Sequence, residues 1–447
     1  MDKIYNISVI GAGHVGLVTA ACLAHLGHKV CCMDNNPSKI DLLSKGKIPI
    51  YEPGLEEMVL QSMAEDRLFF TGSMEEAVNH GEVIFIAVGT PPRENGEADL
   101  SYVENVAREI ASLMESYKLI VEKSTVPVET GEKVKNTIKL YVRKNVPFDV
   151  ASNPEFLREG SAIHDFMNPD RIVIGIDSEK AKRILMDIYK SLNAPIVVTD
   201  IKSAELIKHA SNSFLAMKIS FINAISRICE KVGADVEKVA EGMGLDKRIG
   251  REFLNAGIGF GGSCFPKDID AFIHISESLG YDFRLLKEVK RINDEQRKLV
   301  IQKIKDVLWI IKGKKIAIWG VAFKPDTDDI RGAPAIDIID QLITEGAKVC
   351  IYDPQAMENL KTVFDDSRID YVQDKYQAIH DADCLLIVTE WEEFRNVDFN
   401  LMKKKMRFPF IVDGRNIYSS YNLQEKEFIY YGFGKPLPSG VKSQMRK

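Results

Sequence analysis

The chain has 447 residues, of which 45% are hydrophobic and 28% are charged, and its formal net charge at pH 7 is −6. This length predicts two or three domains, and the composition is that of a globular protein. The acidic balance argues against binding to nucleic acid, which needs a concentrated basic surface.

Other classes of protein are excluded by the way residues are distributed. The apolar runs, such as 83–88, are far shorter than a bilayer span, so we expect no membrane segment. The chain runs into a predicted strand from its start, and we therefore expect no signal peptide. Seven scattered cysteines predict a cytoplasmic protein without a disulfide framework. No histidines and cysteines have the spacing of a metal site, so we expect no metal.

Strand-like and helical segments alternate over the first 200 residues, which we expect to form one domain (1–200). Short apolar runs predict strands at 4–10, 29–34, 83–88, 119–123, 148–151, 171–176 and 195–199, and helical periodicity predicts helices at 15–26, 100–116 and 129–143. Such alternation is typical of a parallel, doubly wound sheet.

The pattern changes at about residue 201. Residues 202–231 contain no glycine or proline and predict one helix of about 45 Å. Helical segments continue to about 312, and strand–helix alternation then resumes, with strands expected at 314–320, 349–353, 384–389 and 410–413 and a helix at 334–346. We therefore predict an α/β protein in which two Rossmann-like doubly wound domains (1–200 and 313–435) are joined by a central helical domain (201–312). From about Gly434 the chain has glycines, prolines and basic residues with little apolar content, and residues 436–447 are expected to be a flexible tail.

Three glycines lie between the first predicted strand and its helix, in the pattern Gly11-x-Gly13-x-x-Gly16. They allow a tight turn whose backbone N–H groups approach a pyrophosphate at the helix N-terminus. Asp34 ends the second predicted strand, where a carboxylate binds a ribose diol and repels a 2′-phosphate. A glycine turn followed by an aspartate can also be purely structural, but this context favours NAD. The predicted cofactor residues are Gly11, Gly13, His14, Val15, Gly16, Asp34 and Lys39, although a lysine at position 39 is in most proteins an ordinary surface residue.

Two further strand ends carry threonines, Thr90 and Thr125. Ligands of doubly wound sheets lie beyond the carboxyl ends of the strands, so both threonines are candidates for the cofactor site. Ordinary turn chemistry is the alternative, since threonine and proline are common in loops.

The stretch GFGGSCFPKD places Cys264 after three glycines and just before Pro266. Proline suits the first turn of a helix expected at 269–279, so Cys264 would lie at the positive N-terminal end of that helix, which favours a thiolate. This setting predicts a nucleophile rather than a buried structural cysteine. Asp268 fits two interpretations equally: a carboxylate of the first helical turn, or a group that handles a proton or a water beside the thiol.

Lys208 and Asn212 are four residues apart on the long predicted helix and share one face. A lysine at such a position is in most proteins a solvated surface residue, and His209 is expected to be packed or exposed rather than a ligand.

A thiol nucleophile beside an NAD site points to a particular chemistry. Hydride removal from an alcohol gives a carbonyl, which the thiol traps as a thiohemiacetal. A second hydride leaves a thioester, and water releases an acid with two NAD reduced.

Several stretches together resemble the UDP-glucose/GDP-mannose dehydrogenase family, and the likeness covers residues 4 to about 432. They are GAGHVGLVTA (11–20), IPIYEPGL (48–55), KSTVP (123–127), NPEFLREG (153–160), NPDRIVIG (168–175), GFGGSCFPKD (259–268) and GVAFKPDTDDIR (320–331). The resemblance implies oxidation of UDP-glucose to UDP-glucuronate with two NAD and water. Ser263, and Phe265 with the Pro266-Lys267 that follow it, are similar to members that act on UDP-glucose. Members that act on GDP-mannose or on UDP-N-acetylhexosamines remain the alternatives.

The resemblance also implies roles for residues at matching positions. Cys264 would be the nucleophile, Lys208 and Asn212 would hold the reacting oxygen, and Thr125 with Asp268 would position a water. Glu155 would act as general acid and base, Glu159 would lie near the nicotinamide, and Arg331 would reach the cofactor. Arg248 is similar to an arginine that the family donates to the neighbouring subunit's substrate. The substrate contacts implied in this way are Glu155, Phe156, Leu157, Glu159, Lys208, Asn212, Arg248, Phe260, Gly261, Gly262, Ser263, Cys264, Phe323, Lys324 and Arg415.

Two other functions are alternatives to this one. A two-electron NAD dehydrogenase of a hydroxy acid would need neither Cys264 nor Glu155, and an NAD-sensing module without catalysis gives no reason for a thiol flanked by glycines.

The long helix also predicts a protein partner. An apolar face along Leu206, Phe214, Leu215, Phe221, Ile222 and Ile225 is expected to pack against its copy in a homodimer, or else to span the two α/β domains as a hinge.

Overall fold

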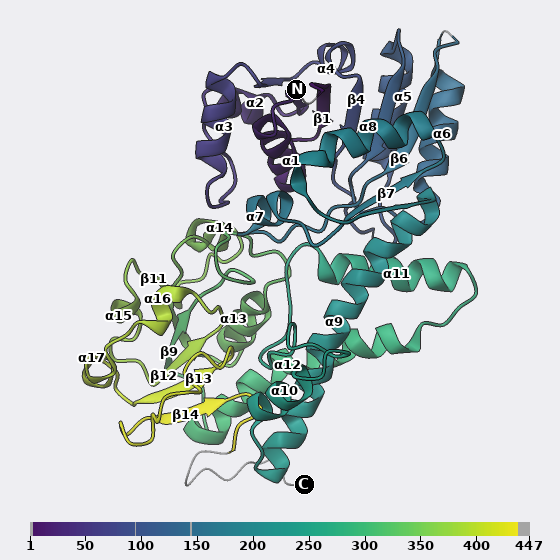
Figure 1. Cartoon of the computed structure of the whole chain (residues 1–447). Helices are drawn as coiled ribbons and strands as arrows, with labels where there is room; N and C mark the ends of the chain where they lie inside the picture. The colour runs from purple at the N-terminus through teal and green to yellow at the C-terminus, as the bar shows by residue number, and fades with distance from the viewer. Residues whose placement is uncertain (1–2, 94, 144, 437–447) are drawn as a thin grey trace. The chain divides into compact units, whose positions relative to one another are not determined.

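A computed structural model describes residues 3–93, 95–143 and 145–436 and shows an α/β protein (Figure 1). The chain divides into two compact units. The first comprises residues up to Ser211 together with Asp270–Tyr281, and the second comprises Asn212–Ile269 and the chain from Asp282 onward. The segment 201–312, predicted as a separate helical domain, is thus shared between the two units. Most of the predicted tail, from residue 437, lies outside the described residues.

The first unit is built on an eight-stranded sheet with the order β3-β2-β1-β4-β5-β6-β7-β8. Its strands are β1 (Asn6–Ile10), β2 (Lys29–Met33), β3 (Leu68–Thr71), β4 (Val83–Ile86), β5 (Lys118–Glu122), β6 (Phe148–Ser152), β7 (Ile172–Ile176) and β8 (Ile196–Thr199). All neighbouring strands are parallel except β6 and β7, which are antiparallel. The strand order reverses between β1 and β4, which is where a doubly wound sheet opens a crevice for a ligand.

Helices cover both faces of this sheet, because successive strand residues point to opposite sides. Val9 and Cys32 pack into the core beneath α1, α3, α7 and α8, whereas Ile10 and Cys31 pack beneath α4, α5 and α6. The helices of this unit are α1 (His14–His25), α2 (Pro37–Ser44), α3 (Leu55–Ala64), α4 (Met74–His80), α5 (Ser101–Leu113), α6 (Thr130–Tyr141), α7 (Ala162–Met167) and α8 (Glu179–Tyr189), followed by a short 3₁₀ turn (Lys190–Leu192).

The second unit contains a six-stranded sheet with the order β11-β10-β9-β12-β13-β14, in which every neighbouring pair is parallel. Its strands are β9 (Lys315–Trp319), β10 (Lys348–Tyr352), β11 (Ile369–Tyr371), β12 (Cys384–Ile387), β13 (Phe410–Asp413) and β14 (Ile429–Gly432). The helices that lie wholly in it are α10 (Val236–Gly244), α12 (Arg284–Leu308), α13 (Pro334–Thr344), α14 (Met357–Lys361), α15 (Lys375–Ala378), α16 (Glu392–Arg395) and α17 (Phe399–Lys405).

Two helices contribute residues to both units. They are α9 (Ile201–Val232), the long helix that the sequence predicts, and α11 (Phe265–Ser278), which follows the cysteine stretch.

The predicted fold class and long helix are confirmed, and the predicted strands all occur within a few residues of their expected bounds. The strands that the sequence analysis missed are β3, β11 and β14, which lie at or next to sheet edges and are short. Edge strands bury less apolar surface, so their hydrophobic pattern is weak.

The chain stays ordered beyond the point where composition predicts a loose end. The backbone N–H of Gly434 donates to Glu230 at 2.8 Å, and Lys435 Nζ pairs with Asp235 at 2.7 Å and with Glu237 at 2.9 Å. Hydrogen bonds and ion pairs with residues distant in the sequence order this segment, and the local amino-acid composition does not reveal them.

Glu230 also pairs with Lys303, whose side chain is 0% exposed, at 2.7 Å. Burial lowers the pKa of Lys303, and removal of the carboxylate leaves a buried cation without a counter-ion. We expect Glu230→Gln to lower the free energy of unfolding of the second unit by about 3 kcal/mol, and Glu230→Gln/Lys303→Met to regain at least half of that loss. All three tryptophans, Trp309, Trp319 and Trp391, belong to this unit, so their fluorescence in urea reports the change.

The matched control for this pair is Glu345→Gln. It breaks the half-exposed pair with Lys305 and is expected to cost less than about 1 kcal/mol. Equal losses for the buried and the half-exposed pair would contradict the prediction.

Candidate active site

The glycine turn of the first unit follows β1 and opens α1. Gly11 has a φ of +104°, and a Cβ there would lie 2.5 Å from the carbonyl oxygen of Ala87. A Cβ on Gly16 would lie 1.8 Å from the carbonyl oxygen of Gly11, whereas a Cβ on Gly13 would meet nothing within 4 Å. Two glycines are therefore required by the fold itself, and the third borders open space at the N-terminus of α1. This arrangement fits a dinucleotide phosphate.

Asp34 follows β2 and is held beside this turn. Its carboxylate accepts hydrogen bonds from the backbone N–H groups of Ala12 at 2.8 Å and Asn36 at 3.0 Å, and it pairs with Lys39 Nζ at 2.7 Å. Burial alone would raise the pKa of Asp34, but Lys39 and the two amides hold it below its ordinary value. A carboxylate at this position suits a ribose diol, and the structure places Lys39 next to it.

His14 and Val15 are the first two residues of α1. His14 Nε2 lies 3.0 Å from a carboxylate oxygen of Glu52, whose side chain is 1% exposed. Val15 is half-buried behind the glycine turn.

Thr90 and Thr125 meet at the carboxyl ends of β4 and β5. Thr90 Oγ1 donates to the carbonyl oxygen of Thr125 at 2.9 Å, and the neighbouring Ser124 Oγ donates to the carbonyl oxygen of Val88 at 2.8 Å. These bonds join the two loops on the side of the sheet where the glycine turn lies.

A buried ion pair links α9 to the loop after β6. Lys208 Nζ lies 2.9 Å from Glu155 Oε1, and each side chain is 5% exposed. Burial by itself would raise the pKa of Glu155, but Lys208 and the N–H of Leu157, at 2.6 Å from Oε2, hold it below its ordinary value. Phe156 lies beneath this pair, with Lys208 Nζ 5.3 Å from its ring centroid.

The same loop lines a small pocket of about 40 Å³. Its walls include Glu155, Phe156 and Leu157 of the loop together with Lys123 and Arg171. Glu159 follows in this loop and is half-buried.

Three further ionisable groups are buried around β5 and α9. Burial raises the pKa of Glu122 to about 8 and that of Glu205 to about 7, and it lowers the pKa of Lys123 to about 8. Lys123 Nζ donates to Asn153 at 3.0 Å, and Glu205 accepts from the backbone N–H groups of Glu129 and Gly131, both at 2.7 Å. Glu205 thus holds the start of α6.

In the second unit, Cys264 immediately precedes α11. The N–H of Asp268 donates to the carbonyl oxygen of Cys264 at 2.8 Å, so the cysteine is the residue from which the helix begins. Cys264 is half-buried, whereas the other six cysteines are buried. Ser263 Oγ lies 3.7 Å from its sulfur. An accessible thiol at a helix N-terminus is thereby distinguished from the structural cysteines, as the sequence predicts.

Asp268 lies one turn further along α11 and is 3% exposed. Asn212 Nδ2 donates to it at 2.6 Å, and Lys267 Nζ lies 3.4 Å from its other oxygen. Of the two interpretations that the sequence left open, a plain first-turn carboxylate would not need a buried amide partner. The structure gives Asp268 such a partner in Asn212.

The glycines before Cys264 are required by the packing of the chain itself. A Cβ on Gly261 would lie 2.3 Å from the carbonyl oxygen of Gly332, and one on Gly262, which has a φ of +92°, would lie 2.8 Å from the ring of Phe323. Between them and Gly259, the backbone of Phe260 is fixed by Asn293, whose Oδ1 accepts from its N–H at 2.8 Å. The atoms that come close to these glycines are those of the protein itself.

Arg415 follows β13 and ties three backbone segments together. Its guanidinium donates to the carbonyl oxygens of Val388 at 2.7 Å, Gly259 at 3.0 Å and Phe323 at 3.2 Å. Lys324 is half-buried, with Nζ 5.5 Å from the centroid of the Phe323 ring. Phe323, Lys324 and Arg415 therefore gather beyond the carboxyl ends of β9 and β13, beside the glycine stretch.

Two predicted arginines have exposed side chains. Arg248 pairs with Asp246 at 2.6 Å with 88% of its side chain exposed, and Arg331 pairs with Asp329 at 2.7 Å with 68% exposed. Their assigned contacts, with a neighbouring subunit's substrate and with the cofactor, remain predictions.

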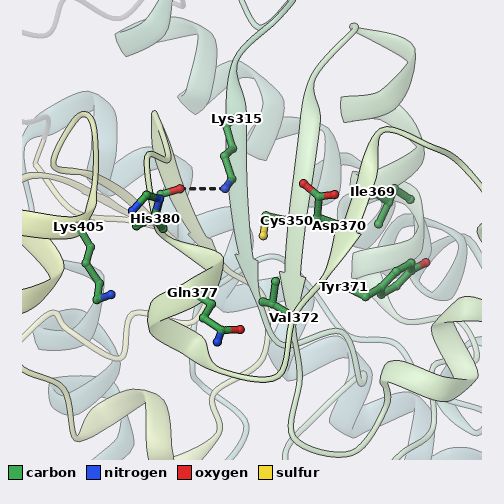
Figure 2. Close-up of a pocket in the computed structure, with 9 residues that line it drawn as sticks. All are labelled: Lys315, Cys350, Ile369, Asp370, Tyr371, Val372, Gln377, His380 and Lys405. Carbon is green, nitrogen blue, oxygen red and sulfur yellow. Dashed lines mark hydrogen bonds between the residues drawn. The ribbon is translucent and has the colours of Figure 1, made fainter.

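A larger pocket of about 620 Å³ lies elsewhere on the second unit and contains none of the predicted residues (Figure 2). It opens on the face of β9–β11, near the amino end of β9, and Lys315 there donates to the carbonyl oxygen of His380 at 2.8 Å. Among the described residues, no cluster of three or more histidine, cysteine or acidic side chains is placed to hold a metal ion. Within the same residues, every helix is too short or too polar to span a bilayer.

Sequence reasoning missed several residues that hold the candidate site. Glu52 is a buried carboxylate bonded to backbone amides, and Asn293 and Arg297 both bind the backbone of Phe260. The stretch IPIYEPGL marked the position of Glu52, but nothing in the sequence shows which distant amides a carboxylate will meet.

A dinucleotide turn in one α/β unit, and an accessible cysteine at a helix start in a second α/β unit, define an oxidoreductase that uses NAD. Comparison with known proteins agrees. Residues 5–193 match the NAD binding domain of the UDP-glucose/GDP-mannose dehydrogenase family, residues 202–295 match its central domain, and residues 317–420 match its UDP binding domain. The chain belongs to this family.

The relatives are similar over almost their whole length. UDP-glucose 6-dehydrogenase TuaD of Bacillus subtilis is 48% identical over 436 residues, which cover 98% of this chain and 94% of that protein. UDP-glucose 6-dehydrogenase of Rhizobium meliloti is 46% identical over 438 residues, covering 96% of this chain and all of the relative (100%). The solved structure of a UDP-glucose dehydrogenase from Pyrobaculum islandicum has a TM-score of 0.90 at 42% identity, with 97% of this chain and 98% of the other covered.

The buried carboxyl of Glu122 gives a testable pH dependence. Between its ordinary pKa of 4.5 and its raised value of about 8, the folded chain keeps a proton that the unfolded chain releases. Stability therefore falls as pH rises through this window, by up to about 1.4 kcal/mol per pH unit. Because Glu122→Gln has no such proton, its thermal midpoint should fall less than that of the parent between pH 5 and 8.

The control for this measurement is Glu132→Gln, which changes a carboxylate that is 56% exposed on α6. This variant should follow the pH profile of the parent. Parallel profiles for Glu122→Gln and the parent would show that Glu122 is ionised in the folded protein.

Proposed function

We propose that this chain oxidises UDP-glucose to UDP-glucuronate, with two NAD reduced per turnover and Cys264 as the covalent nucleophile. The observation that carries the proposal is the placement of Cys264 at the start of α11 with the Asn212–Asp268 pair one turn away. The UDP-glucose 6-dehydrogenases that resemble the chain at 42–48% identity support the choice of substrate.

Residues of the first unit would hold the cofactor. Gly11, Gly13 and Gly16 shape the turn for the phosphates with the first residues of α1, His14 and Val15, and Asp34 suits a ribose, with Lys39 beside it. Thr90 and Thr125 lie on the neighbouring strand ends. We assign Glu159 and Arg331 to the cofactor from the family resemblance. When bound, NAD supplies the acceptor for the hydrides that leave the substrate.

Cys264 divides the oxidation into two stages. Loss of a hydride from the 6-carbon and of a proton from its hydroxyl group gives an aldehyde. The thiolate adds to the aldehyde carbon, and the resulting oxyanion takes up a proton to form a thiohemiacetal. Loss of the second hydride from this carbon and of the hydroxyl proton leaves a thioester. Water then attacks the thioester carbon, the carbon–sulfur bond breaks, and the carboxylate leaves with the thiolate restored. Backbone N–H groups at the start of α11 favour negative charge on the sulfur when it leaves.

Buried polar residues would handle the charges of these intermediates. Lys208 and Asn212 would stabilise the oxyanion that forms on the reacting carbon. Glu155 would act as general acid and base, as the family resemblance implies, and Asp268 with Thr125 would position the hydrolytic water. Each group is already held by protein partners, so little reorganisation is needed during the reaction.

Cationic and glycine-rich segments would bind the nucleotide sugar. Lys324 and Arg415 provide positive charge for a diphosphate, beside Phe323 and the backbone of residues 260–263. In the first unit, Glu155, Phe156, Leu157 and Glu159 provide a loop for the sugar, and Arg248 would reach the substrate of a neighbouring subunit. Ser263 favours glucose over N-acetylated sugars. GDP-mannose and UDP-N-acetylhexosamines are the alternative substrates.

The test is the number of NADH molecules formed per molecule of limiting UDP-glucose, with GDP-mannose and UDP-N-acetylglucosamine assayed in parallel. We expect two NADH from UDP-glucose. Cys264→Ala should lower the rate at least about 10³-fold, because the aldehyde can no longer be trapped. Cys229→Ala, which alters a buried cysteine of α9, should keep both the rate and the stoichiometry.

A yield of one NADH would place the chain among two-electron dehydrogenases and remove the role of Cys264. Binding of NAD without turnover of any of the three sugars would favour a sensing module.

We further propose that the chain forms a homodimer through α9. The side chains of Leu206, Phe214 and Phe221 are 42%, 58% and 48% exposed, and Ile228 and Val232 continue the same helical face at 57% and 70%. Of the other residues predicted for this face, Ile222 is buried in its own unit and Leu215 and Ile225 are half-buried, so the exposed stripe is narrower than the sequence suggests. A self-complementary apolar stripe suits a two-fold interface.

Light scattering tests the dimer. We expect the mass of two chains for the parent protein and of one chain for Phe221→Glu, since burial of two carboxylates at a two-fold contact is unfavourable. Leu140→Glu, at an exposed leucine of α6, is the control and should stay dimeric. A monodisperse parent monomer would refute the proposal.

A further inference from the structure

Glu52 is a buried acidic residue to which the proposed reaction gives no role. It lies between α2 and α3, in the stretch IPIYEPGL, and its side chain is 1% exposed. A carboxylate at this depth is tolerated only when its oxygens are bonded, because a lone buried charge is costly. Its contacts therefore show what it holds together.

The carboxylate bonds to the loop that follows the Lys208–Glu155 pair. Oε2 accepts from the backbone N–H of Gly160 at 2.7 Å, and Oε1 accepts from that of Ala162, the first residue of α7, at 2.8 Å. These two bonds hold the loop at its far end, while Lys208 holds its near end through Glu155. The segment between them includes Glu159.

The same carboxylate also lies at the cofactor turn. Its Oε2 is 3.0 Å from Nε2 of His14, the first residue of α1 and the neighbour of Gly13. Glu52 is thus placed beside the first residues of two helices, α1 and α7, whose N-termini both favour negative charge. All three segments belong to the first unit.

We propose that Glu52 is a positioning residue that fixes the loop 155–162 relative to the cofactor turn. In the proposed function this loop carries the proton acceptor Glu155 and the nicotinamide neighbour Glu159, so the inference rests on that function for its effect on turnover. The effect on cofactor affinity and on the order of the loop follows from the contacts alone.

The first test measures NAD binding by calorimetry and the exchange of backbone amides in residues 158–163. Glu52→Gln keeps the size of the side chain but points an amino group at one of the two backbone N–H groups. We expect the NAD Kd to rise about 10-fold and the amides of Gly160 and Ala162 to exchange at least about 10-fold faster. We expect kcat to fall by about 10- to 100-fold, with two NADH still formed per UDP-glucose.

Glu205→Gln is the matched control. Glu205 is also buried in the same unit and also accepts two backbone N–H groups, but those groups belong to the start of α6. We expect a similar loss of thermal stability with the NAD Kd within about 3-fold of the parent. If Glu205→Gln weakens NAD as much as Glu52→Gln does, the effect is a general loss of stability and the proposal is wrong.

A double-mutant cycle with His14→Asn tests the connection to the cofactor turn. If Glu52 acts on the turn through His14, the two substitutions together should weaken NAD by less than the product of their separate effects. Strictly independent effects would overturn that part of the proposal. Should Glu52→Gln fail to fold, Glu52→Asp, which keeps the charge but is too short to reach both amides, takes its place with the same expected changes.

These outcomes separate the inference from the proposed function. A parent enzyme that yields one NADH would refute the proposed function, while unchanged NAD affinity and unchanged amide exchange in Glu52→Gln would refute the role of Glu52.

Discussion

The ion pair between Lys208 and Glu155 buries two opposite charges in the first unit, with each side chain 5% exposed. Either charge alone at that depth would cost several kcal/mol, so each residue needs the other and both need the backbone around them. The pair thereby connects α9 to the loop after β6, and the rest of that loop is held by Glu52. In the second unit the Asn212–Asp268 pair connects α9 to the start of α11 in the same manner. One long helix therefore carries a buried polar anchor in each unit.

Both sheets have a glycine turn that is bound by an aspartate, but the two aspartates differ in their surroundings. After the first strand of each sheet a glycine with positive φ turns the chain, Gly11 at +104° and Gly320 at +86°, and an aspartate after the second strand binds the turn. Asp34 bonds to two amides and to Lys39 and lies beside open space. Asp353 accepts from four backbone N–H groups and from the indole of Trp391, and it is 2% exposed. The first carboxylate keeps 10% of its side chain exposed, whereas the second is bonded on all sides by the protein itself.

Close packing of the backbone also explains why glycines precede the thiol of Cys264. The backbone of Gly259, Gly261 and Gly262 lies so close to Asn293, Gly332 and Phe323, respectively, that a Cβ at any of the three positions would clash. Arg415 then fastens the carbonyl oxygens of Gly259 and Phe323. The loop that carries Cys264 is therefore held in place by contacts within the protein itself.

The sequence by itself determined the features that depend on local pattern. Period and composition predicted both α/β units and α9, because strands and helices bury different spacings of apolar residues. Glycine spacing and the proline at 266 placed the cofactor turn and the cysteine at helix starts, since those positions need special backbone geometry. Short edge strands such as β11 were not predicted, because a strand of three residues is too short to show a hydrophobic periodicity.

Only the tertiary structure decided which distant groups meet. It paired Lys208 with Glu155 across 53 positions and Glu52 with amides more than 100 positions away, and it showed that the glycines before Cys264 make room for the chain itself. The physical reason is that a buried charge or a close backbone approach is satisfied by whatever the fold brings alongside it, and no local pattern records that partner.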